Sequence, residues 1–299
     1  MSLKVLHFGA SGQFAREMLA RASGAVEITA LSRADLDLGQ TEAIARTIGE
    51  APDIDLVINA AAYTAVDRAQ DEPDLAYAIN ATAPAAMAKA CQTRGVPLIH
   101  LSTDMVFSGS KKGPYVETDP VGPLHVYGAS KLAGEEAVIA HCDRALIARV
   151  SWLFSAYGQN FLQMMLRLGE SQPVLRVVDD QRACPTSSGD VAAFLLSQSQ
   201  RLATAPKGSP VWGLLHLVNE GVASRYDMAQ AIFALAWPGR EPPRIEPVPT
   251  TAFPTPARRA LNGELATGRL NDVFGLSLRP WREALEDTVL ELLPAKVGP

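Results

Sequence analysis

The sequence predicts an α/β protein with a doubly wound parallel sheet, and three observations carry the prediction. Short apolar runs alternate with segments of helical periodicity through the first half of the chain, which is the order expected of βαβ units. The first apolar run leads directly into a glycine-rich turn and then into a helical pattern. The chain has 299 residues, of which 47% are hydrophobic and 20% charged, and these are ordinary values for a folded globular protein.

The apolar runs predict five strands in the first half of the chain and two in the second. Their ranges are 5–8, 27–31, 56–59, 97–102, 145–150, 174–178 and 214–218. Helical periodicity is clearest at 14–22, 75–93, 161–169, 190–201, 225–236 and 280–293. The segment 238–256 contains seven prolines and cannot form a regular helix. It is either an extended segment that lines a site or a surface linker.

Charge and composition exclude several classes of function. The formal net charge is -5, whereas a nucleic-acid binder usually carries a basic surplus, so no nucleic-acid partner is expected. No apolar run approaches the roughly 18 residues of a membrane span, so no membrane association is expected. The three cysteines form no CxxC pair and the five histidines show no ligand spacing, so no metal site is expected. The first strand begins without a leader-like segment, which favours a cytoplasmic protein.

The glycine-rich turn predicts a dinucleotide site. Gly9 and Gly12 follow the first strand in a GxxGxxA pattern that ends at Ala15. Glycines at such a turn allow close approach of the backbone to a pyrophosphate, and the next helix offers unpaired N–H groups. The alternative is an ordinary strand-to-helix turn. The small residues after the third strand, which include Ala62, Tyr63 and Thr64, would let a cofactor lie flat along the backbone.

The end of the second strand favours NADPH over NADH. An NAD-binding protein of this type places an acidic residue near this point, to bind the ribose hydroxyls. Here Ser32 is followed by Arg33, and a guanidinium suits a 2′-phosphate. Asp37 and Leu38 follow in the same loop, where Asp37 either approaches the adenine or helps the loop to fold. NADH remains the alternative, with Arg33 merely exposed to solvent.

These features divide the chain into two expected domains. Residues 1–152 would form an NADP-binding Rossmann domain, and residues 153–299 would form mainly a smaller substrate-binding domain. The helical pattern and strand within about 188–218 would return to the Rossmann domain.

A serine-threonine pair and a YxxxK motif predict the reaction centre. Thr103 ends the fourth strand, and Tyr127 and Lys131 lie four residues apart in a helical pattern, so they share a helix face. Bringing a phenol from pKa 10 to about 7 takes about 4 kcal/mol, and an ammonium ~5 Å away contributes about 3 kcal/mol. Lys131 would therefore make Tyr127 a proton exchanger, while Thr103 holds the substrate oxygen. The alternative is an ordinary helix with an exposed lysine and a half-buried tyrosine.

This ordered set resembles the extended short-chain dehydrogenase/reductase family, and within it the dTDP-4-dehydrorhamnose reductases. The matching segments run from residue 5 to about 285. Among them are FGASGQ (8–13), NAAAYTAVD (59–67), STDMVF (102–107), VYGASKLAGE (126–135), RVSW (149–152) and PTTAFPTPARR (249–259). The last segment is the most specific, because general members of the superfamily lack it.

The resemblance implies the reaction and assigns most of the site. NADPH would deliver hydride to the keto carbon of dTDP-4-dehydro-L-rhamnose, Tyr127 would donate the proton, and the product would be dTDP-L-rhamnose. Lys131 would also hold the nicotinamide ribose. The remaining implied positions are Gly12, Gln13 and Phe14 for the pyrophosphate, Ala62, Tyr63 and Thr64 along the cofactor, and Thr103, Asp104, Trp152, Asn160 and Arg258 for the nucleotide sugar.

Some positions depart from the family pattern. Met105 and Leu101 replace aromatic residues, and Gly263–Glu264 replaces a more usual serine-containing sequence. Some relatives dimerise around magnesium held by glutamates. Glu17 matches one such position, but the region of Asp190 offers no clear second ligand. The resemblance therefore leaves open both a homodimer and a bound Mg²⁺.

Two other functions remain as alternatives. A sugar-nucleotide epimerase or dehydratase on the same scaffold would regenerate its cofactor, and Arg33 and the 249–259 segment argue against it. A non-catalytic NADP-binding regulatory subunit would be expected to lack the Tyr–Lys pair, which this chain retains.

Overall fold

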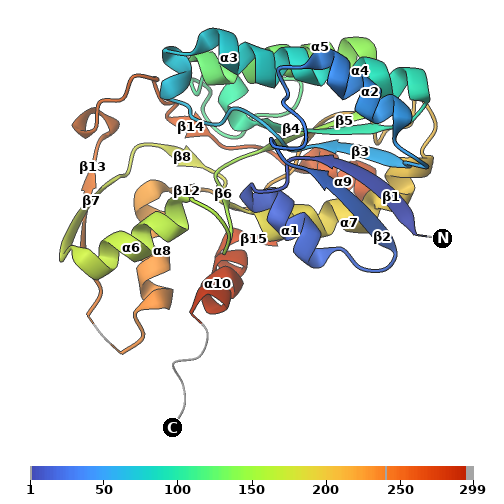
Figure 1. Ribbon diagram of the computed structural model, residues 1–299. Helices are drawn as coiled ribbons and strands as arrows, with labels where there is room; N and C mark the ends of the chain where they lie inside the picture. Colours follow the sequence, from blue (N-terminus) through green and yellow to red (C-terminus); the bar gives the residue numbers. More distant parts are fainter. Residues whose placement is uncertain (1, 240, 294–299) are drawn as a thin grey trace.

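The computed structural model describes residues 2–239 and 241–293 and is built around one six-stranded parallel sheet (Figure 1). The strand order is β2-β1-β3-β4-β5-β10. The strands are β1 (Leu3–Phe8), β2 (Val26–Leu31), β3 (Leu56–Asn59), β4 (Leu98–Thr103), β5 (Ala145–Val150) and β10 (Gly213–His216). Strands β3, β4 and β5 are buried at every residue, as expected for a parallel sheet covered on both faces.

Helices cover both faces of this sheet, so the predicted doubly wound α/β fold is confirmed. One face carries α1 (Gln13–Arg21), α7 (Ser188–Thr204) and α9 (Gly268–Phe274), and the other carries α2 (Thr41–Glu50), α4 (Ala83–Arg94) and α5 (Val126–His141) (Figure 1). Phe14, Phe194 and Leu270 belong to the core beneath the first face, whereas Ile44 and Met87 belong to the core beneath the second.

The strand order reverses beside β1, which pairs with β2 on one side and with β3 on the other. In open α/β sheets, ligands bind where the order reverses, outside the carboxyl ends of the strands. The glycine turn leaves β1 at this point, and the segment 60–64 leaves β3 at the same edge. The topology therefore brings the two predicted cofactor segments together.

A smaller region lies below the sheet in Figure 1 and has its own apolar core. Its helices are α6 (Phe161–Ser171), α8 (Arg225–Ala236) and α10 (Trp281–Leu292). Its short strands form the pairs β7 (Val174–Val178) with β13 (Arg244–Val248), β6 (Leu153–Phe154) with β9 (Thr186–Ser187), and β11 (Asn219–Glu220) with β15 (Leu278–Pro280). A fourth set, β12 (Ala223–Ser224), β8 (Arg182–Ala183) and β14 (Asn262–Gly263), forms a three-stranded sheet.

The chain returns twice from this region to the main sheet. Helix α7 packs against α1, and β10 extends the sheet beside β5, which is where the sequence places the segment 188–218. Helix α9 also returns and packs on β10, a feature that the sequence analysis missed. None of the described helices has both the length and the apolar character needed to cross a membrane.

Two predicted segments have more structure than their patterns indicated. The segment 75–93 divides into α3 (Pro73–Tyr77), a single π-helical stretch (Ala78–Thr82) and α4. The proline-rich segment contains β13 and a 3₁₀ turn (Thr250–Ala252), so its described part is an ordered, largely extended segment. Further 3₁₀ turns occupy Arg68–Gln70 and Asp104–Val106.

A buried ion pair fixes α5 to the sheet. The Glu135 carboxylate on α5 accepts hydrogen bonds from Arg149 on β5, at 2.9 Å to Nε and 2.6 Å to Nη2. Ser102 Oγ on β4 donates to the same carboxylate at 2.5 Å. Both charged side chains are almost fully buried. The pair holds the helix that carries Tyr127 and Lys131 against two neighbouring strands.

Replacing Glu135 with alanine should reduce the free energy of unfolding by about 3 kcal/mol, because Arg149 would remain buried without its counter-ion. Urea unfolding would measure the loss. Glu136→Ala is the matched control, since Glu136 is the next residue and is exposed; its effect should stay within about 0.5 kcal/mol. Equal stabilities for the two variants would contradict the assigned role of the pair.

Candidate active site

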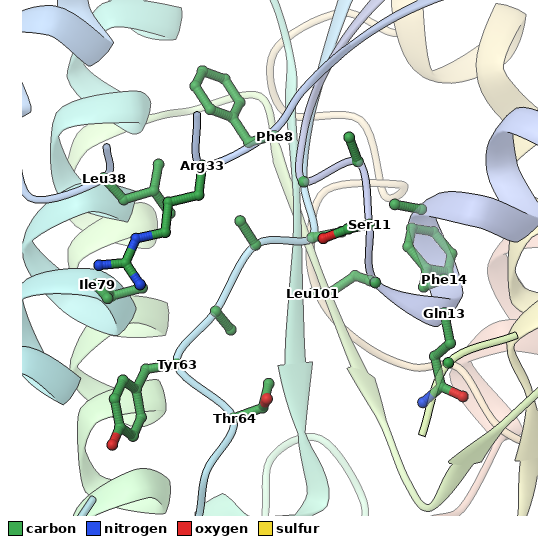
Figure 2. Close-up of a pocket in the computed structure, with 18 of the residues that line it drawn as sticks. Phe8, Ser11, Gln13, Phe14, Arg33, Leu38, Tyr63, Thr64, Ile79 and Leu101 are labelled. Atoms are coloured by element: carbon green, nitrogen blue, oxygen red, sulfur yellow. The ribbon is translucent and has the colours of Figure 1, made fainter. Parts of the chain in front are cut away.

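A cavity of about 790 Å³ lies where the strand order reverses (Figure 2). It is lined by the glycine turn, the end of β2, the segment after β3 and the first part of α5. All the residues predicted to bind the cofactor line this one cavity. They are Gly9, Gly12, Gln13, Phe14, Arg33, Asp37, Leu38, Ala62, Tyr63, Thr64, Tyr127 and Lys131.

The glycine turn has the geometry that an anion site requires. Gly9 has a φ of +106°, and a Cβ on it would lie 3.4 Å from the backbone nitrogen of Ala61, so a side chain would be strained at this position. Gly12 caps the start of α1 without a side chain, and a Cβ there would meet open space. The first turn of α1 contains no acidic residue. Its free N–H groups and the positive end of the helix dipole are therefore available to a phosphate.

The end of β2 presents a cation without a partner. Arg33 is exposed, and no hydrogen bond or ion pair joins it to another residue within 2–239 and 241–293. Figure 2 shows its side chain crossing the cavity wall toward Ile79. The nearby carboxylate of Asp35 accepts hydrogen bonds from Ser32 N and Oγ. Asp37 Oδ1 accepts from the backbone N of Gly39 at 3.0 Å, so Asp37 shapes its own loop.

The segment after β3 is held by several polar contacts, among them two of Tyr63. The backbone N of Tyr63 donates to Asn80 Oδ1 at 2.9 Å, and its hydroxyl donates to Glu72 at 2.8 Å. Glu72 also binds Arg68, and Arg68 lines the cavity. Arg68 is a cavity residue that the sequence analysis missed, since it carries no motif.

The start of α5 places Tyr127 beside Thr103. The helix begins where His125 Nδ1 accepts a hydrogen bond from Gly128 N at 3.0 Å. A Cβ on Gly128 would lie 2.3 Å from the Met105 carbonyl oxygen, so only glycine allows this close approach. The Tyr127 side chain lies near the Thr103 side chain, which lowers the pKa of Tyr127. The helix start and the end of β4 thus bring together the predicted proton donor and the predicted oxygen-binding hydroxyl.

The expected acidification of Tyr127 by Lys131 is not what the structure shows. Burial and the charge of Asp104 raise the pKa of Tyr127 to about 12, although the nearby Thr103 side chain acts to lower it. Lys131 Nζ donates instead to the Leu101 carbonyl oxygen at 2.7 Å and lies 3.3 Å from His100 Nε2. Burial lowers the pKa of Lys131 to about 8. The sequence spacing predicts that Tyr127 and Lys131 lie in one helix. It could not predict that the Lys131 ammonium would donate to the Leu101 carbonyl oxygen.

The Asp104 carboxylate is buried next to Thr103. It accepts hydrogen bonds from Thr103 Oγ1 and Ser151 Oγ, both at 2.9 Å. Burial nevertheless raises its pKa to about 6. A Cβ on Gly263 would lie 2.6 Å from an Asp104 oxygen. The departure from the family pattern at Gly263 therefore leaves room for this carboxylate.

Arg225 is a residue of this site that the sequence analysis did not identify. Its guanidinium carbon lies 3.5 Å from the ring centroid of Trp152 and 4.9 Å from that of Phe161. Burial lowers its pKa to about 10, Asp104 opposes this effect, and Arg259 adds to it. In the described part of the chain no hydrogen bond or ion pair reaches Arg225. A single arginine at a helix start carries no sequence signal, since only the fold brings it to Trp152.

Two other residues predicted to bind substrate, Asn160 and Arg258, differ in their surroundings. Asn160 caps α6 by accepting from Gln163 N, and its amide donates to Gln13, Ser155 and Tyr157. Its side chain thus holds the loop before α6 against α1, and its contact with substrate stays a prediction.

Arg258 is exposed and has no hydrogen-bonding or ionic partner among the described residues. Its neighbour Arg259 binds Asp67 at 2.7 Å and the carbonyl oxygen of Ala257. Arg259 also helps to lower the pKa of His125. The 249–259 segment is therefore attached through Arg259 near the start of α5.

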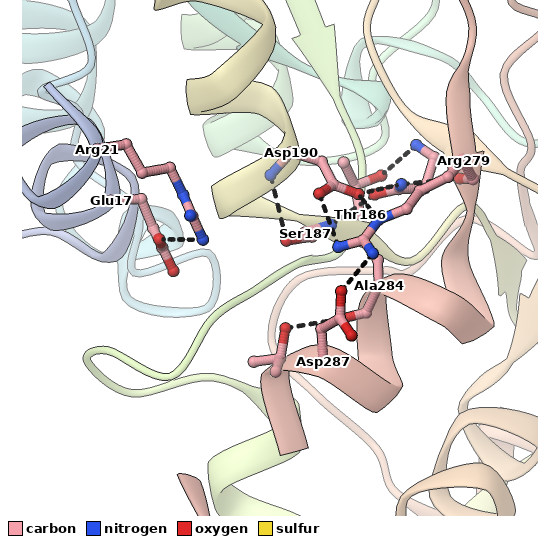
Figure 3. A network of polar contacts seen from close by, with 10 residues as sticks. Glu17, Arg21, Thr186, Ser187, Asp190, Arg279, Ala284 and Asp287 are labelled. Atoms are coloured by element: carbon pink, nitrogen blue, oxygen red, sulfur yellow. Dashed lines mark hydrogen bonds and ion pairs between the residues drawn. The ribbon is translucent and has the colours of Figure 1, made fainter. Parts of the chain in front are cut away.

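The residues that a bridging Mg²⁺ would need are already paired (Figure 3). Glu17 accepts a hydrogen bond from Ser155 at 2.6 Å and pairs with Arg21 at 3.0 Å. Both carboxylate oxygens of Asp190 bind Arg279 at 3.0 Å. Across residues 2–239 and 241–293, no group of three histidine, cysteine or acidic side chains could hold a metal ion. These residues do not fit a magnesium site, because arginines occupy their carboxylates.

Comparison with known proteins finds similarity over nearly the whole chain. The family model described as the RmlD substrate binding domain matches residues 3–293. The dTDP-4-dehydrorhamnose reductase of Sinorhizobium fredii is 40% identical over 287 residues, covering 95% of this chain and 96% of the relative. The chain belongs to the dTDP-4-dehydrorhamnose reductase family.

Solved structures of the family have the same fold over nearly the whole chain. The dTDP-4-dehydrorhamnose reductase from Clostridium acetobutylicum superposes with a TM-score of 0.89 at 35% identity, covering 97% of this chain and 99% of that one. The Bacillus anthracis enzyme, solved in complex with NADP, gives 0.89 at 31% identity and covers 97% and 100%. The dTDP-glucose 4,6-dehydratase of Streptomyces venezuelae, at 18% identity and a TM-score of 0.74, shares the fold alone.

Proposed function

We propose that this chain uses NADPH to reduce the keto group of dTDP-4-dehydro-L-rhamnose, giving dTDP-L-rhamnose. The observation that carries the proposal is the placement of Tyr127 and Thr103. Tyr127 lies near Thr103, whose hydroxyl donates to Asp104, and Tyr127 also lines the cavity formed by the glycine turn. Family membership supplies the nucleotide-sugar class.

The residues that would hold NADPH fit each of its charged parts. The N-terminus of α1 would bind the pyrophosphate, with Gly12, Gln13 and Phe14 in contact. Arg33 would bind the 2′-phosphate, and its guanidinium has no competing partner among the described residues. Lys131 would hold the nicotinamide ribose. The bound cofactor supplies the hydride.

The protein's own part of the reaction is proton donation and orientation. The raised pKa of Tyr127, about 12, keeps its hydroxyl protonated at neutral pH, which is the state that a proton donor needs before reduction. Thr103 would bind the substrate oxygen beside that hydroxyl. The Tyr127 O–H bond breaks as the new alcohol O–H bond forms, and solvent must return one proton to the phenolate after each turnover.

The nucleotide sugar would lie between the main sheet and the smaller region. Asp104 and Trp152 would contact the sugar, and Arg225 would bind the diphosphate, because a half-buried cation with no bonded partner among the described residues is available to an anion. On this proposal, residues 1–152 with the returning segment 188–218 bind the cofactor. The remainder of 153–299 binds mainly the substrate.

Replacing Tyr127 with phenylalanine should reduce kcat by about 10²- to 10⁴-fold, the contribution of a positioned proton donor, and leave the Kd for NADPH unchanged. NADPH oxidation with dTDP-4-dehydro-L-rhamnose measures kcat, and fluorescence titration measures the Kd. Tyr77→Phe is the control, since Tyr77 is 40% exposed on α3. Turnover by Tyr127→Phe at the wild-type rate would contradict the role of Tyr127 as proton donor.

The same assay on the wild-type protein separates the alternative functions. Substrate conversion without net NADPH consumption would favour an epimerase or dehydratase, and no conversion would favour a regulatory subunit.

Replacing Arg33 with alanine should weaken NADPH binding by about 10- to 100-fold, because one charge-assisted contact with the 2′-phosphate is lost. NADH binding should change little, since NADH lacks that phosphate. Calorimetric Kd values for both cofactors test this expectation. Arg46→Ala, which removes another exposed arginine, should affect neither cofactor. Tighter NADH than NADPH binding in wild type would contradict the assigned specificity.

Replacing Arg225 with glutamine should raise the KM for the nucleotide sugar about 10- to 100-fold, through loss of a charged contact with the diphosphate. The Kd for NADPH should stay the same. Arg282→Gln is the matched control, because Arg282 also stacks on a tryptophan, at 4.5 Å from the Trp281 ring. An unchanged KM in the Arg225 variant would mean that the diphosphate binds elsewhere.

A further inference from the structure

His100 contacts Lys131, and the proposed reaction gives it no role. It sits in the middle of β4 and is fully buried. It is absent from the cavity lining, so it would contact neither cofactor nor substrate. Its two ring nitrogens both have polar neighbours, Asn59 Nδ2 at 3.0 Å from Nδ1 and Lys131 Nζ at 3.3 Å from Nε2.

The direction of the hydrogen bonds fixes the tautomer of this histidine. The backbone N–H of Ala61 can only donate, and it donates to Asn59 Oδ1 at 3.2 Å. The Asn59 amide therefore presents Nδ2, also a donor, to His100 Nδ1. His100 Nδ1 must accept, so the single proton of the neutral imidazole is on Nε2.

This tautomer directs an N–H group at Lys131. An Nε2–H can only donate, and Lys131 Nζ can accept only as a neutral amine with a free lone pair. The contact of Nζ with the Leu101 carbonyl, at 2.7 Å, is compatible with the amine, which keeps two N–H donors. The ammonium form, with three N–H groups, would place hydrogen against hydrogen at the 3.3 Å contact.

We propose that His100, held in its Nε2–H tautomer by Asn59, is a positioning residue that binds Lys131 as a neutral amine and so makes this lysine release its proton easily. The proposal deepens the proposed function, on which it rests for the role of Lys131 in the reaction. His100 contacts the Lys131 side chain. It would therefore affect the reaction only by changing the protonation of Lys131.

The charged groups around Lys131 agree with this arrangement. Glu135, one turn further along α5, raises the pKa of Lys131, but its carboxylate is already bound by Arg149 of β5. Burial has the larger effect and lowers the pKa of Lys131 to about 8. Burial and the charge of Lys131 hold the pKa of His100 well below its usual value, so the imidazole stays neutral and keeps one proton.

The direct test is an NMR titration of the full chain labelled with ¹³Cε-lysine. The sequence contains seven lysines, and loss of one signal in Lys131→Met assigns Lys131. Its midpoint should lie near 8, against about 10.4 for an ordinary lysine. In His100→Gln the midpoint should rise by at least about one pH unit, because the amide oxygen can accept from the ammonium.

His216→Gln is the matched control. His216 is also a fully buried histidine, on β10, and its ring contacts Ala266 and Phe107 rather than Lys131. Its replacement should leave the Lys131 midpoint unchanged. An ordinary midpoint for Lys131 in wild type, or the same midpoint in wild type and His100→Gln, would overturn the proposal.

Two further measurements on the wild-type protein test the proposal even if His100→Gln does not fold. The ¹⁵N shifts of the wild-type imidazole should show the proton on Nε2, and a proton on Nδ1 would refute the proposal. The pH profile of kcat/KM, which reports the free enzyme, should fall above about pH 8. That fall should move to higher pH in His100→Gln. If the nucleotide sugar is not reduced at all, the proposed function fails, while the NMR results still decide the role of His100.

Discussion

The close packing of α5 against β5, the turn after β4 and the π-helical stretch Ala78–Thr82 is the constraint on which the site depends. Glycine at 128 lets the first turn of the helix contact the Met105 carbonyl, and glycine at 134 allows an equally close approach to Asn80. The buried Glu135 carboxylate then joins the helix to Arg149. With two close contacts and one ion pair along its length, α5 cannot rotate or slide without breaking at least one of them. The positions of the phenol and the ammonium follow from this fit.

Burial, more than any single charged neighbour, sets the chemistry of these groups. It raises the pKa values of Tyr127 and Asp104, and it lowers those of Lys131 and Arg225. All four shifts move toward the uncharged form, as removal from water requires. A reductase that donates a proton benefits from this, because its tyrosine must be protonated when the substrate binds. The strong acidification expected from a nearby ammonium would suit the reverse reaction, in which the same tyrosine removes a proton.

The sequence was sufficient for the sheet, because parallel buried strands and amphipathic helices leave strong apolar patterns. It was also sufficient to bring the predicted cofactor residues around one cavity, since glycine turns and strand ends occupy fixed places in this topology. The sequence was insufficient where one side chain had several hydrogen-bonding or stacking partners within reach. Asn160 became a helix cap, Lys131 turned toward Leu101, and Arg225 reached Trp152 only through the fold. Such choices depend on contacts between distant segments, which local spacing does not contain.

The arginine pairs at Glu17 and Asp190, two residues that do not line the cavity, illustrate the same point. Matching the family at Glu17 indicated an oxygen ligand for a metal, yet a carboxylate serves equally well as the partner of a guanidinium. Arg21 also lies so close to Gly189 that a Cβ there would be 2.4 Å from its Nη2. The arginine thus fills the space between α1 and α7 while neutralising Glu17. A cation supplied by the chain requires no ion from solution, so the junction between these helices should not depend on a divalent metal.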